Sequence, residues 1–348
     1  MSVQAATAIL ATAPPRAPFA IEARDLVKTY AKQVRALDGL SFAVPSGTVF
    51  SLLGPNGAGK STTIKILTTL AQADSGTASV AGLSVRANPA AVRHAIGVVA
   101  QRSGADPMAP GRENLLLSGR IQGLRGRDLA RRADELLGRF GLADAAGRLV
   151  RTYSGGMRRR LDVAMGLINR PAVLFLDEPT AGLDPESRSA MWDEIRRLSG
   201  AEGLTILLTT HYLEEADRLA SRLAIVDRGR VVAAGTPDEL KGELRGDAVH
   251  VELAQPTHDE VRTALEPVPG IREIRVDGQH LSTRADDGAS AVPTVLAALD
   301  GAGIAVAAVT VARPSLDDVY LRYAGRRFAD AELSQNQSQP TIPTRESR

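Results

Sequence analysis

The chain has 348 residues, of which 44% are hydrophobic and 24% charged, and its formal net charge is +2. These fractions are ordinary for a folded globular protein and exclude a fibrous or wholly disordered chain. No run approaches the ~18 apolar residues that cross a bilayer, and the lack of cysteine excludes disulfides, thiolate catalysis and cysteine metal sites.

The charge is divided unevenly along the chain. Residues 241–348 carry 12 basic and 16 acidic side chains, which leaves 30 basic and 24 acidic ones for residues 1–240. A nucleic-acid-binding protein concentrates basic residues on one face, so this distribution predicts no nucleic-acid partner. Residues 1–18 lack the basic and apolar segments of a signal peptide, and with the polar residues 328–348 they are predicted to be disordered.

Short strands alternate with helices in the first part of the chain. Apolar or alternating runs predict strands at Phe19–Tyr30, Leu37–Val44, Thr48–Leu53, Ile96–Ala100, Val173–Leu176, Thr205–Leu208 and Leu223–Val226. Helical patterns cover residues 60–70, 113–121 and 128–140, and another helix runs from Ser154 to a point before Pro171. This order predicts an α/β domain with a parallel sheet over residues 19–245, interrupted by a helical subdomain at about residues 106–170.

The pattern of predicted strands and helices changes at about residue 246. Before this point, a capping box at residues 236–239 starts a helix. The predicted strands and helices then stand in the order β-α-β-β-α-β, at Val249–Ala254, Thr257–Leu265, Ile271–Val276, His280–Arg284, Val292–Leu299 and Ile304–Val311. This order predicts a small α+β domain of the ferredoxin-like kind over residues 246–327, with a further helix at Leu316–Tyr323.

A phosphate-binding loop follows the third strand and opens a helix. Its residues are Gly54, Pro55, Asn56, Gly57, Ala58, Gly59, Lys60, Ser61 and Thr62. The glycines let backbone N–H groups point at phosphates, and the helix N-terminus adds partial positive charge. We expect Lys60 to reach the β- and γ-phosphates of a nucleotide and Ser61 to bind Mg²⁺. The alternative is a plain glycine-rich turn without a ligand. A strand directly before the loop and a helix directly after it make this alternative less favoured.

Two acidic residues and a histidine follow later strands. Asp177 and Glu178 end an apolar run, and the corresponding position in an α/β sheet lies beside the phosphate loop. We expect Asp177 to hold Mg²⁺ and Glu178 to polarise water against the γ-phosphate. His211 also follows a strand, although a lone histidine is more often structural than functional.

A second candidate anion site starts the helix at Ser154. Ser154, Gly155 and Gly156 combine a favoured N-cap residue with backbone N–H groups that suit a phosphate. One chain cannot readily present both this site and the Lys60 loop to one γ-phosphate. The sequence therefore suggests a dimer in which each copy completes the site of the other.

These motifs stand in the order found in the ATP-binding cassette (ABC) ATPases, which the chain resembles over about residues 20–240. The matching segments are Gly54–Thr62, Gln101, Tyr153–Met157, Leu176–Thr180, Gly182–Pro185 and His211. The chain also resembles the ATPase subunits of daunorubicin/doxorubicin-resistance exporters, at Tyr153–Leu161 (YSGGMRRRL), Thr209–Leu219 (TTHYLEEADRL) and Pro314–Leu321 (PSLDDVYL). The resemblance implies a P-loop NTPase fold with ATP and Mg²⁺ as its ligands.

The resemblance also implies roles for single residues. Tyr30 would stack on adenine, and Gln101 would contact Mg²⁺ and water while sensing a membrane partner. Asp184 would communicate across the dimer, His211 would contact the γ-phosphate, and Ser154–Gly156 would close over the ATP of the second copy. The residues expected to act in catalysis are therefore Lys60, Gln101, Glu178 and His211.

Two positions depart from the commonest family pattern. Met157 stands where a glutamine is usual, and a methionine cannot donate the hydrogen bonds of an amide. Ala100 stands where proline is frequent before the loop glutamine, which would loosen that turn. Neither departure touches Lys60, Asp177 or Glu178, so we expect a competent ATPase.

The resemblance implies the energy-coupling subunit of an ABC exporter for amphipathic, antibiotic-like drugs. Its expected partners are a separately encoded multi-span permease and a second copy of itself, at the cytoplasmic face of the membrane. The small C-terminal domain would serve dimerisation or permease docking. The alternatives are an exporter subunit for lipids, polysaccharide or peptides, an importer subunit, a soluble ABC ATPase and a cassette that does not hydrolyse ATP.

Overall fold

The computed structural model describes residues 18–244, 246–255, 259–325 and 328–330. The chain divides into two compact units, one up to Val231 and the other from Val232 onwards. Most of the predicted leader and tail, namely residues 1–17 and 331–348, lies outside the described residues. The prediction of disorder from residue 328 is wrong at its start, because Phe328 is buried against the Tyr320 ring. None of the helices in the described part of the chain is long and apolar enough to cross a membrane.

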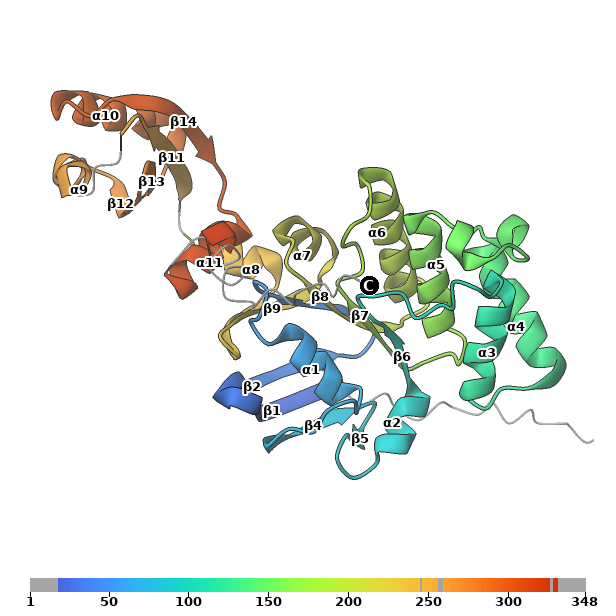
Figure 1. Cartoon of the computed structure of the whole chain (residues 1–348). Coiled ribbons are helices and arrows are strands. Elements are labelled where there is room, and N and C mark those ends of the chain that lie inside the picture. Colours follow the sequence, from blue (N-terminus) through green and yellow to red (C-terminus); the bar gives the residue numbers. More distant parts are fainter. Residues whose placement is uncertain (1–17, 245, 256–258, 326–327, 331–348) are drawn as a thin grey trace, which may run out of the picture. The chain divides into compact units, whose positions relative to one another are not determined.

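The first unit is built on a six-stranded sheet in the order β10-β9-β3-β8-β7-β6 (Figure 1). Its strands are β3 (Val49–Leu53), β6 (Ile96–Val99), β7 (Val173–Asp177), β8 (Thr205–Thr210), β9 (Arg222–Asp227) and β10 (Arg230–Gly235). The pairs from β9 through β3, β8 and β7 to β6 are parallel, as the alternation of strands and helices predicts. Every residue of β3 and β8 is buried, which is typical of a parallel sheet covered on both faces.

Alternate residues of the strands enter two separate cores. Leu174 and Leu176 of β7 face a core shared with helices α3 (Gly111–Ile121), α4 (Gly126–Arg139), α5 (Gly155–Gly166), α6 (Pro185–Gly200) and α7 (Leu213–Leu219). Val173 and Phe175 face the other core, which contains α1 (Lys60–Leu67) and α2 (Pro89–Ala95). Helices α3, α4 and α5 fall within the range predicted for the helical insert, and Figure 1 shows them together beyond one edge of the sheet.

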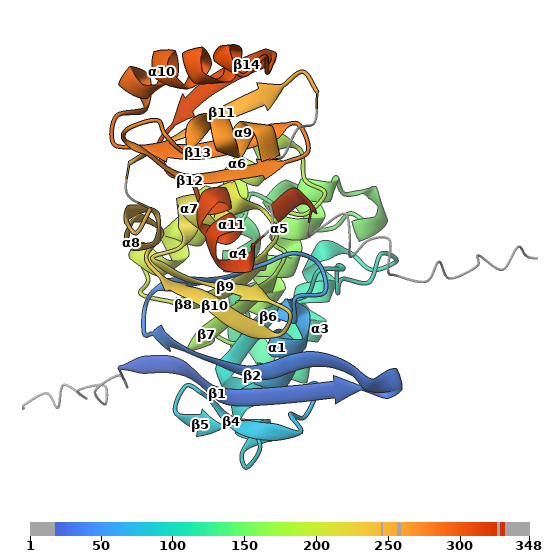
Figure 2. The ribbon, with the colours of Figure 1, turned by 90° about the vertical axis from the view of Figure 1, so that its left-hand side faces the viewer.

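A second, antiparallel sheet completes this unit in the order β2-β1-β4-β5 (Figure 2). Its strands are β1 (Phe19–Tyr30), β2 (Val34–Pro45), β4 (Ser75–Val80) and β5 (Leu83–Ser84). The first two predicted strands are confirmed, but they belong to this sheet rather than to the parallel one. The helix after the phosphate loop ends at Leu67 instead of Leu70, because Thr69 adopts a left-handed conformation with φ 66°.

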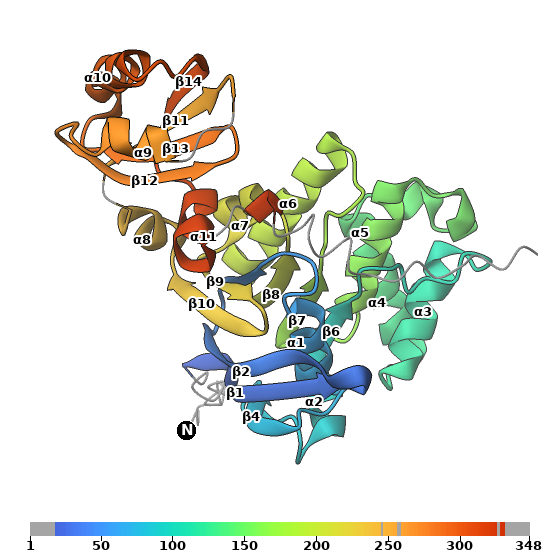
Figure 3. The same cartoon turned by 60° about the vertical axis from the view of Figure 1, so that its left-hand side comes forward.

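The second unit contains the predicted β-α-β-β-α-β domain. Its elements are α8 (Pro237–Gly242), β11 (Asp247–Leu253), α9 (Asp259–Leu265), β12 (Ile271–Asp277), β13 (His280–Ala285), α10 (Gly288–Gly301), β14 (Val306–Ala312) and α11 (Leu316–Ala324). The sheet order β12-β13-β11-β14 is antiparallel throughout, and α9 and α10 cover one face (Figure 3). This arrangement confirms the ferredoxin-like prediction.

Candidate active site

Four loops of the first unit meet at one edge of the parallel sheet. They follow β3, β6, β7 and β8, and they carry the phosphate loop, Gln101, the Asp177–Glu178 pair and His211. Carboxyl ends of parallel strands share an edge, so residues far apart in sequence become neighbours there. The structure thereby brings together most of the side chains that the sequence predicts for the site.

The phosphate loop is closely fitted to its surroundings. Gly59 has φ 110°, and a Cβ atom there would lie 2.6 Å from the carbonyl oxygen of Ala36. A residue with a side chain would therefore be both strained and obstructed at this position. Lys60 is buried, and its Nζ donates to the carbonyl oxygens of Gly54 at 2.6 Å and Pro55 at 2.9 Å. The loop holds its lysine at the helix N-terminus, where a phosphate group would bind.

A hydroxyl and a carboxylate meet beside this loop. The Ser61 Oγ donates to Oδ1 of Asp177 at 3.3 Å, and Thr209 Oγ1 donates to the same oxygen at 2.6 Å. Hard oxygen ligands of this kind, few in number and adjacent to phosphates, suit Mg²⁺ bound together with a nucleotide. The residues present therefore fit the expected Mg²⁺ site. The described residues hold no cluster of three or more His, Cys, Asp or Glu side chains that would bind a metal without the nucleotide.

Glu178 is the centre of the site. Gln101 Nε2 donates to its Oε2 at 2.9 Å, and Nδ1 of His211 lies 3.2 Å from its Oε1. The backbone of Glu178 is left-handed, with φ 48°, which is unfavourable for a residue other than glycine. Its N–H donates to both the carbonyl and the hydroxyl oxygen of Thr209, at 3.2 and 3.1 Å. The surrounding groups thus hold Glu178 by its backbone and by one carboxylate oxygen, and His211 lies against the other oxygen.

The electrostatic environment keeps Glu178 ionised. Burial by itself raises the pKa of this carboxyl group, but contacts with His211, Lys60 and Gln101 together lower it by more. The net pKa of Glu178 lies below the ordinary value of a glutamate, so the carboxylate is charged at neutral pH.

Tyr30 lies on the hairpin that flanks the loop. It ends β1, where it pairs with Val34 of β2, and its side chain is exposed. The Lys28 Nζ lies 5.6 Å from the centre of the Tyr30 ring. The same hairpin brings the carbonyl of Ala36 against Gly59. No described contact joins the Tyr30 ring to the phosphate loop itself.

The remaining predicted residues form a second cluster, at the N-termini of α5 and α6. Ser154 caps α5 by accepting from the N–H of Met157 at 3.2 Å, and Asp184 caps α6 by accepting from the N–H of Ser187 at 2.9 Å. A Cβ atom at Gly156 would lie 2.5 Å from the Ser187 Oγ, so the two helix ends are in contact. Hydrogen bonds from backbone and side chain of Ser187 lower the pKa of Asp184.

The structure shows the contacts of both residues that depart from the family pattern, Met157 and Ala100. The Met157 side chain packs against the hydrophobic core, so it contributes packing where an amide would offer hydrogen bonds. The carbonyl of Ala100 accepts from Arg159 Nη1 at 2.6 Å, which fixes the turn that a proline would otherwise stiffen.

Three further residues belong to the site and were not predicted from the sequence. Thr209 bridges Asp177 and Glu178, while Arg159 and Asp162 contact the loops of Glu178 and Gln101. The Thr-Thr pair just before His211 could have pointed to Thr209. The arginine triplet stands within the segment YSGGMRRRL that carries the resemblance, but nothing in the sequence singles out Arg159 or Asp162 as site residues.

Comparisons with known proteins agree with this geometry. A family model described as "ABC transporter" matches residues 37–181, and one described as "ATP-binding protein DrrA1-3-like, C-terminal domain" matches residues 235–324. The chain is 45% identical to the daunorubicin resistance ATP-binding protein DrrA2 of Streptomyces coeruleorubidus, covering 91% of this chain and 98% of that protein. It is 40% identical to the Nod factor export ATP-binding protein I of Ralstonia nicotianae, covering 88% of this chain and 94% of that protein.

The fold has solved counterparts as well. A dimeric ATP-binding cassette in a post-hydrolysis state, bound to ADP and Pi, matches with a TM-score of 0.58 and 24% identity. The match covers 62% of this chain and 98% of the solved one. A likeness at this level of identity concerns the fold, and it confirms the predicted P-loop cassette.

Proposed function

The chain belongs to the ATP-binding proteins of ABC transporters, in the group of the drug-resistance protein DrrA, and from this we propose that it powers the export of an amphipathic drug. The observation that supports ATP hydrolysis is the arrangement of Glu178 beside the phosphate loop, where Gln101 donates to one oxygen and His211 Nδ1 lies 3.2 Å from the other. Such a carboxylate is placed to polarise water next to a bound γ-phosphate.

We assign the following roles at the nucleotide. Lys60 exchanges its two carbonyl partners for the β- and γ-phosphates, and the loop N–H groups bind the remaining oxygens. Ser61 and Asp177 would hold Mg²⁺, and the bound ion would neutralise charge on the phosphates. Glu178 orients and polarises the attacking water, while His211 contacts the γ-phosphate and keeps the carboxylate in place.

The cluster at the α5 and α6 N-termini serves a second copy of the chain. Ser154, Gly155 and Asp184 are exposed in the described structure. The Ser154 hydroxyl and the N–H groups at the start of α5 suit a phosphate, whereas Asp184, a carboxylate that caps α6, would communicate across the dimer. In a dimer the groups at the start of α5 would close over ATP held by the Lys60 loop of the other copy. Each ATP is then bound by two chains, and binding drives dimerisation.

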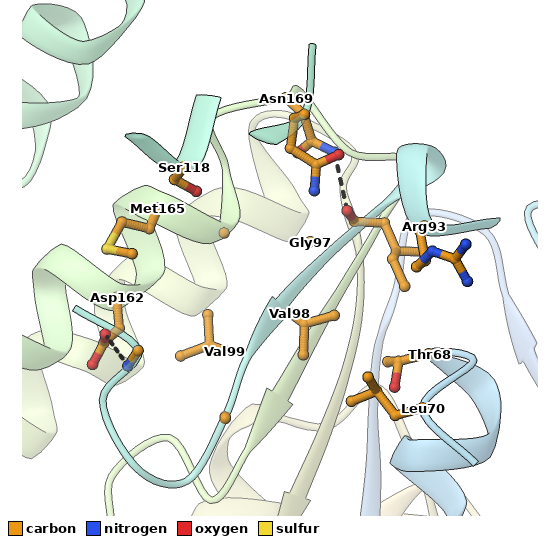
Figure 4. Close-up of a pocket in the computed structure, with 15 residues that line it drawn as sticks. Thr68, Leu70, Arg93, Gly97, Val98, Val99, Ser118, Asp162, Met165 and Asn169 are labelled. Carbon is orange, nitrogen blue, oxygen red and sulfur yellow. Dashed lines mark hydrogen bonds between the residues drawn. The ribbon is translucent and has the colours of Figure 1, made fainter. Parts of the chain in front are cut away.

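A groove beside the Gln101 loop is the proposed contact for the membrane permease (Figure 4). It has a volume of about 310 Å³ and lies between β6, α5 and the end of α1. Val98 and Leu70 line it with side chains 37% and 72% exposed, and Met165 lines its other side. Exposed apolar side chains gathered at a hollow are typical of a protein-binding surface. Ala100 also lines the groove and directly precedes Gln101, so a docked segment would adjoin the loop that holds Glu178.

The drug-like substrate is proposed from the relatives rather than from a pocket in this chain. The DrrA2 relative is named for daunorubicin resistance, whereas the relative named for Nod factor export favours a second candidate, the export of a different molecule such as a Nod factor. Both candidates require transport through a membrane protein, and the chain itself would lie at the cytoplasmic face.

A knockout of the gene distinguishes these substrates. We expect the deleted strain to accumulate several-fold more daunorubicin, with recovery on expression of the wild-type chain but not of Glu178→Gln. Unchanged drug accumulation together with loss of another exported molecule, such as a Nod factor, would favour the second candidate. An unchanged phenotype in both assays would contradict the export function.

A further inference from the structure

Helix α5 carries two buried charged residues that the proposed function does not yet use. Arg159 and Asp162 are 7% and 6% exposed and lie one turn apart on this helix. Arg158, next to Arg159 in the same triplet, is exposed. A buried arginine is costly unless all its donors are satisfied, so its partners show what it is held for.

All the hydrogen-bond acceptors described for Arg159 are backbone carbonyls of two loops at the site. Its Nε donates to Pro179 at 2.7 Å, and its Nη2 donates to Asp177 at 3.0 Å and Glu178 at 3.1 Å. Its Nη1 donates to Ala100 at 2.6 Å, directly before Gln101. The planar guanidinium group thus joins the loop after β6 to the loop after β7. The ammonium group of a lysine could not bind all these carbonyls at once.

The bond to the Glu178 carbonyl has a particular consequence. The left-handed backbone of Glu178 is a conformation that costs on the order of 1–3 kcal/mol and persists only when the surroundings impose it. Arg159 binds the carbonyl on one side of this residue, and Thr209 binds its N–H on the other. Together they hold the direction in which the carboxylate points.

Asp162 holds the other end of the Gln101 loop. One of its oxygens accepts from the Ser103 Oγ at 2.9 Å and from the Gly104 N–H at 3.1 Å. Figure 4 draws the second of these bonds, at the labelled Asp162. Arg159 and Asp162 therefore bind the chain immediately before and shortly after Gln101, whose amide donates to Glu178.

The helix that bears this pair is firmly seated. A Cβ atom at Gly97 of β6 would lie 2.0 Å from the carbonyl of Gly166, near the end of α5. The backbones of strand β6 and helix α5 are thus in contact. This contact holds the part of the helix that carries Arg159 and Asp162 in a fixed position.

We infer that Arg159 and Asp162 are positioning residues for ATP hydrolysis, which set the orientation of the Glu178 carboxylate and of its Gln101 partner. The inference rests on the proposed ATPase function. A purely structural pair would stabilise the fold alone. A positioning pair also governs the rate of the chemical step without touching the nucleotide.

The test compares Arg159→Lys with Arg158→Lys in the full-length chain. We expect Arg159→Lys to lower kcat by on the order of 10–100-fold, because small displacements of a reacting group carry such penalties. The Kd for a fluorescent ATP analogue should change less than about twofold, since the phosphate loop is untouched. Arg158→Lys, at an exposed site, should leave kcat and Kd unchanged.

A double-mutant cycle separates positioning from stability. If Arg159 acts through Glu178, then Arg159→Lys should have almost no further effect on the residual turnover of Glu178→Gln. An equal fold-loss in both backgrounds, or a lowered Tm with unchanged kcat, would overturn the inference. If Arg159→Lys does not fold, the same kinetic measurements are made on Asp162→Asn. We expect a lowered kcat with an unchanged Kd, and an unchanged kcat would overturn the inference. A wild-type chain without ATPase activity would instead contradict the proposed function itself.

Discussion

At the scale of single residues, the site depends on how Glu178 is held. Its carboxylate is buried, charged and contacted at both oxygens, and its backbone is strained. The sequence predicted Glu178, Gln101 and His211, and the structure brings these three together. Their roles remain predictions until they are tested by substitution.

The first prediction concerns Glu178→Gln. The amide keeps the size of the side chain but cannot act as a base, so turnover should fall by roughly 10²–10⁴-fold. ATP binding should persist because Lys60 and Ser61 are unchanged. Phosphate release and nucleotide binding measure the two effects. Turnover within about twofold of wild type would remove Glu178 from the mechanism.

The second prediction concerns pH. In His211→Ala the contact that lowers the Glu178 pKa most is lost while burial still raises it, so the pKa of Glu178 should rise. A base that acts in its ionised form loses activity as the pH falls through its pKa. The acidic limb of the kcat/KM profile should therefore move to higher pH.

Tyr212→Phe is the matched control for this shift. Its ring lies 4.1 Å from the His211 ring, and the substitution keeps that contact. The acidic limb of the control should stay in place. A limb in His211→Ala that is unmoved, or that moves to lower pH, would contradict the account.

Some site residues could not be read from the sequence because side-chain burial decides their role. Arg158 and Arg159 are adjacent and chemically identical, yet only the second is buried against the loops. The face of α5 that turns inward is set by packing against β6, which the local pattern does not reveal.

At the scale of elements, the buried parallel strands were predictable because their apolar runs are short and nearly continuous. The strands β4, β5 and β10 and the helices α2, α6 and α7 were not predicted. Strand β4 is largely exposed and has no clear alternation, and α2 spans only seven residues. Helix α6 does begin with Asp184 as N-cap and Pro185 in its first turn, a start signal that was interpreted only as a motif.

The third prediction tests how α6 and α7 are joined. Glu215 of α7 is fully buried, and its Oε1 accepts from Trp192 Nε1 at 3.0 Å and Thr180 Oγ1 at 2.8 Å. Glu215→Ala removes the oxygen that accepts both hydrogen bonds and leaves a cavity, so the free energy of unfolding should fall by about 2–4 kcal/mol. Trp192 is the single tryptophan of the chain, so its fluorescence reports unfolding of this unit.

Glu215→Gln is the control, because its amide oxygen can accept from the same donors. It should be clearly more stable than Glu215→Ala. Equal stability of the two variants would show that these hydrogen bonds do not hold α6 and α7.

At the scale of the whole molecule, the chain combines a cassette with a second unit that family models recognise separately. The sequence placed the change of rhythm at about residue 246, whereas packing divides the chain between Val231 and Val232. The reason is local to the second unit: α8 packs with α11, where Arg322 Nη1 donates to the carbonyl of Glu243 at 3.1 Å. The periodicity of a sequence reports only local structure, so it could not predict a boundary that depends on contacts between distant segments.

The central claim is that this chain works as a dimeric ATPase on a membrane permease. Its most direct test is a pull-down from native membranes, with tagged Glu178→Gln chain, ATP and Mg²⁺ to trap the closed dimer. Lys60→Ala, which should not hold the phosphates, is the matched control. The account predicts that a multi-span membrane protein is recovered with Glu178→Gln and ATP, and is lost with the control. Recovery of ribosomes or DNA-processing proteins, or of no membrane protein at all, would contradict it.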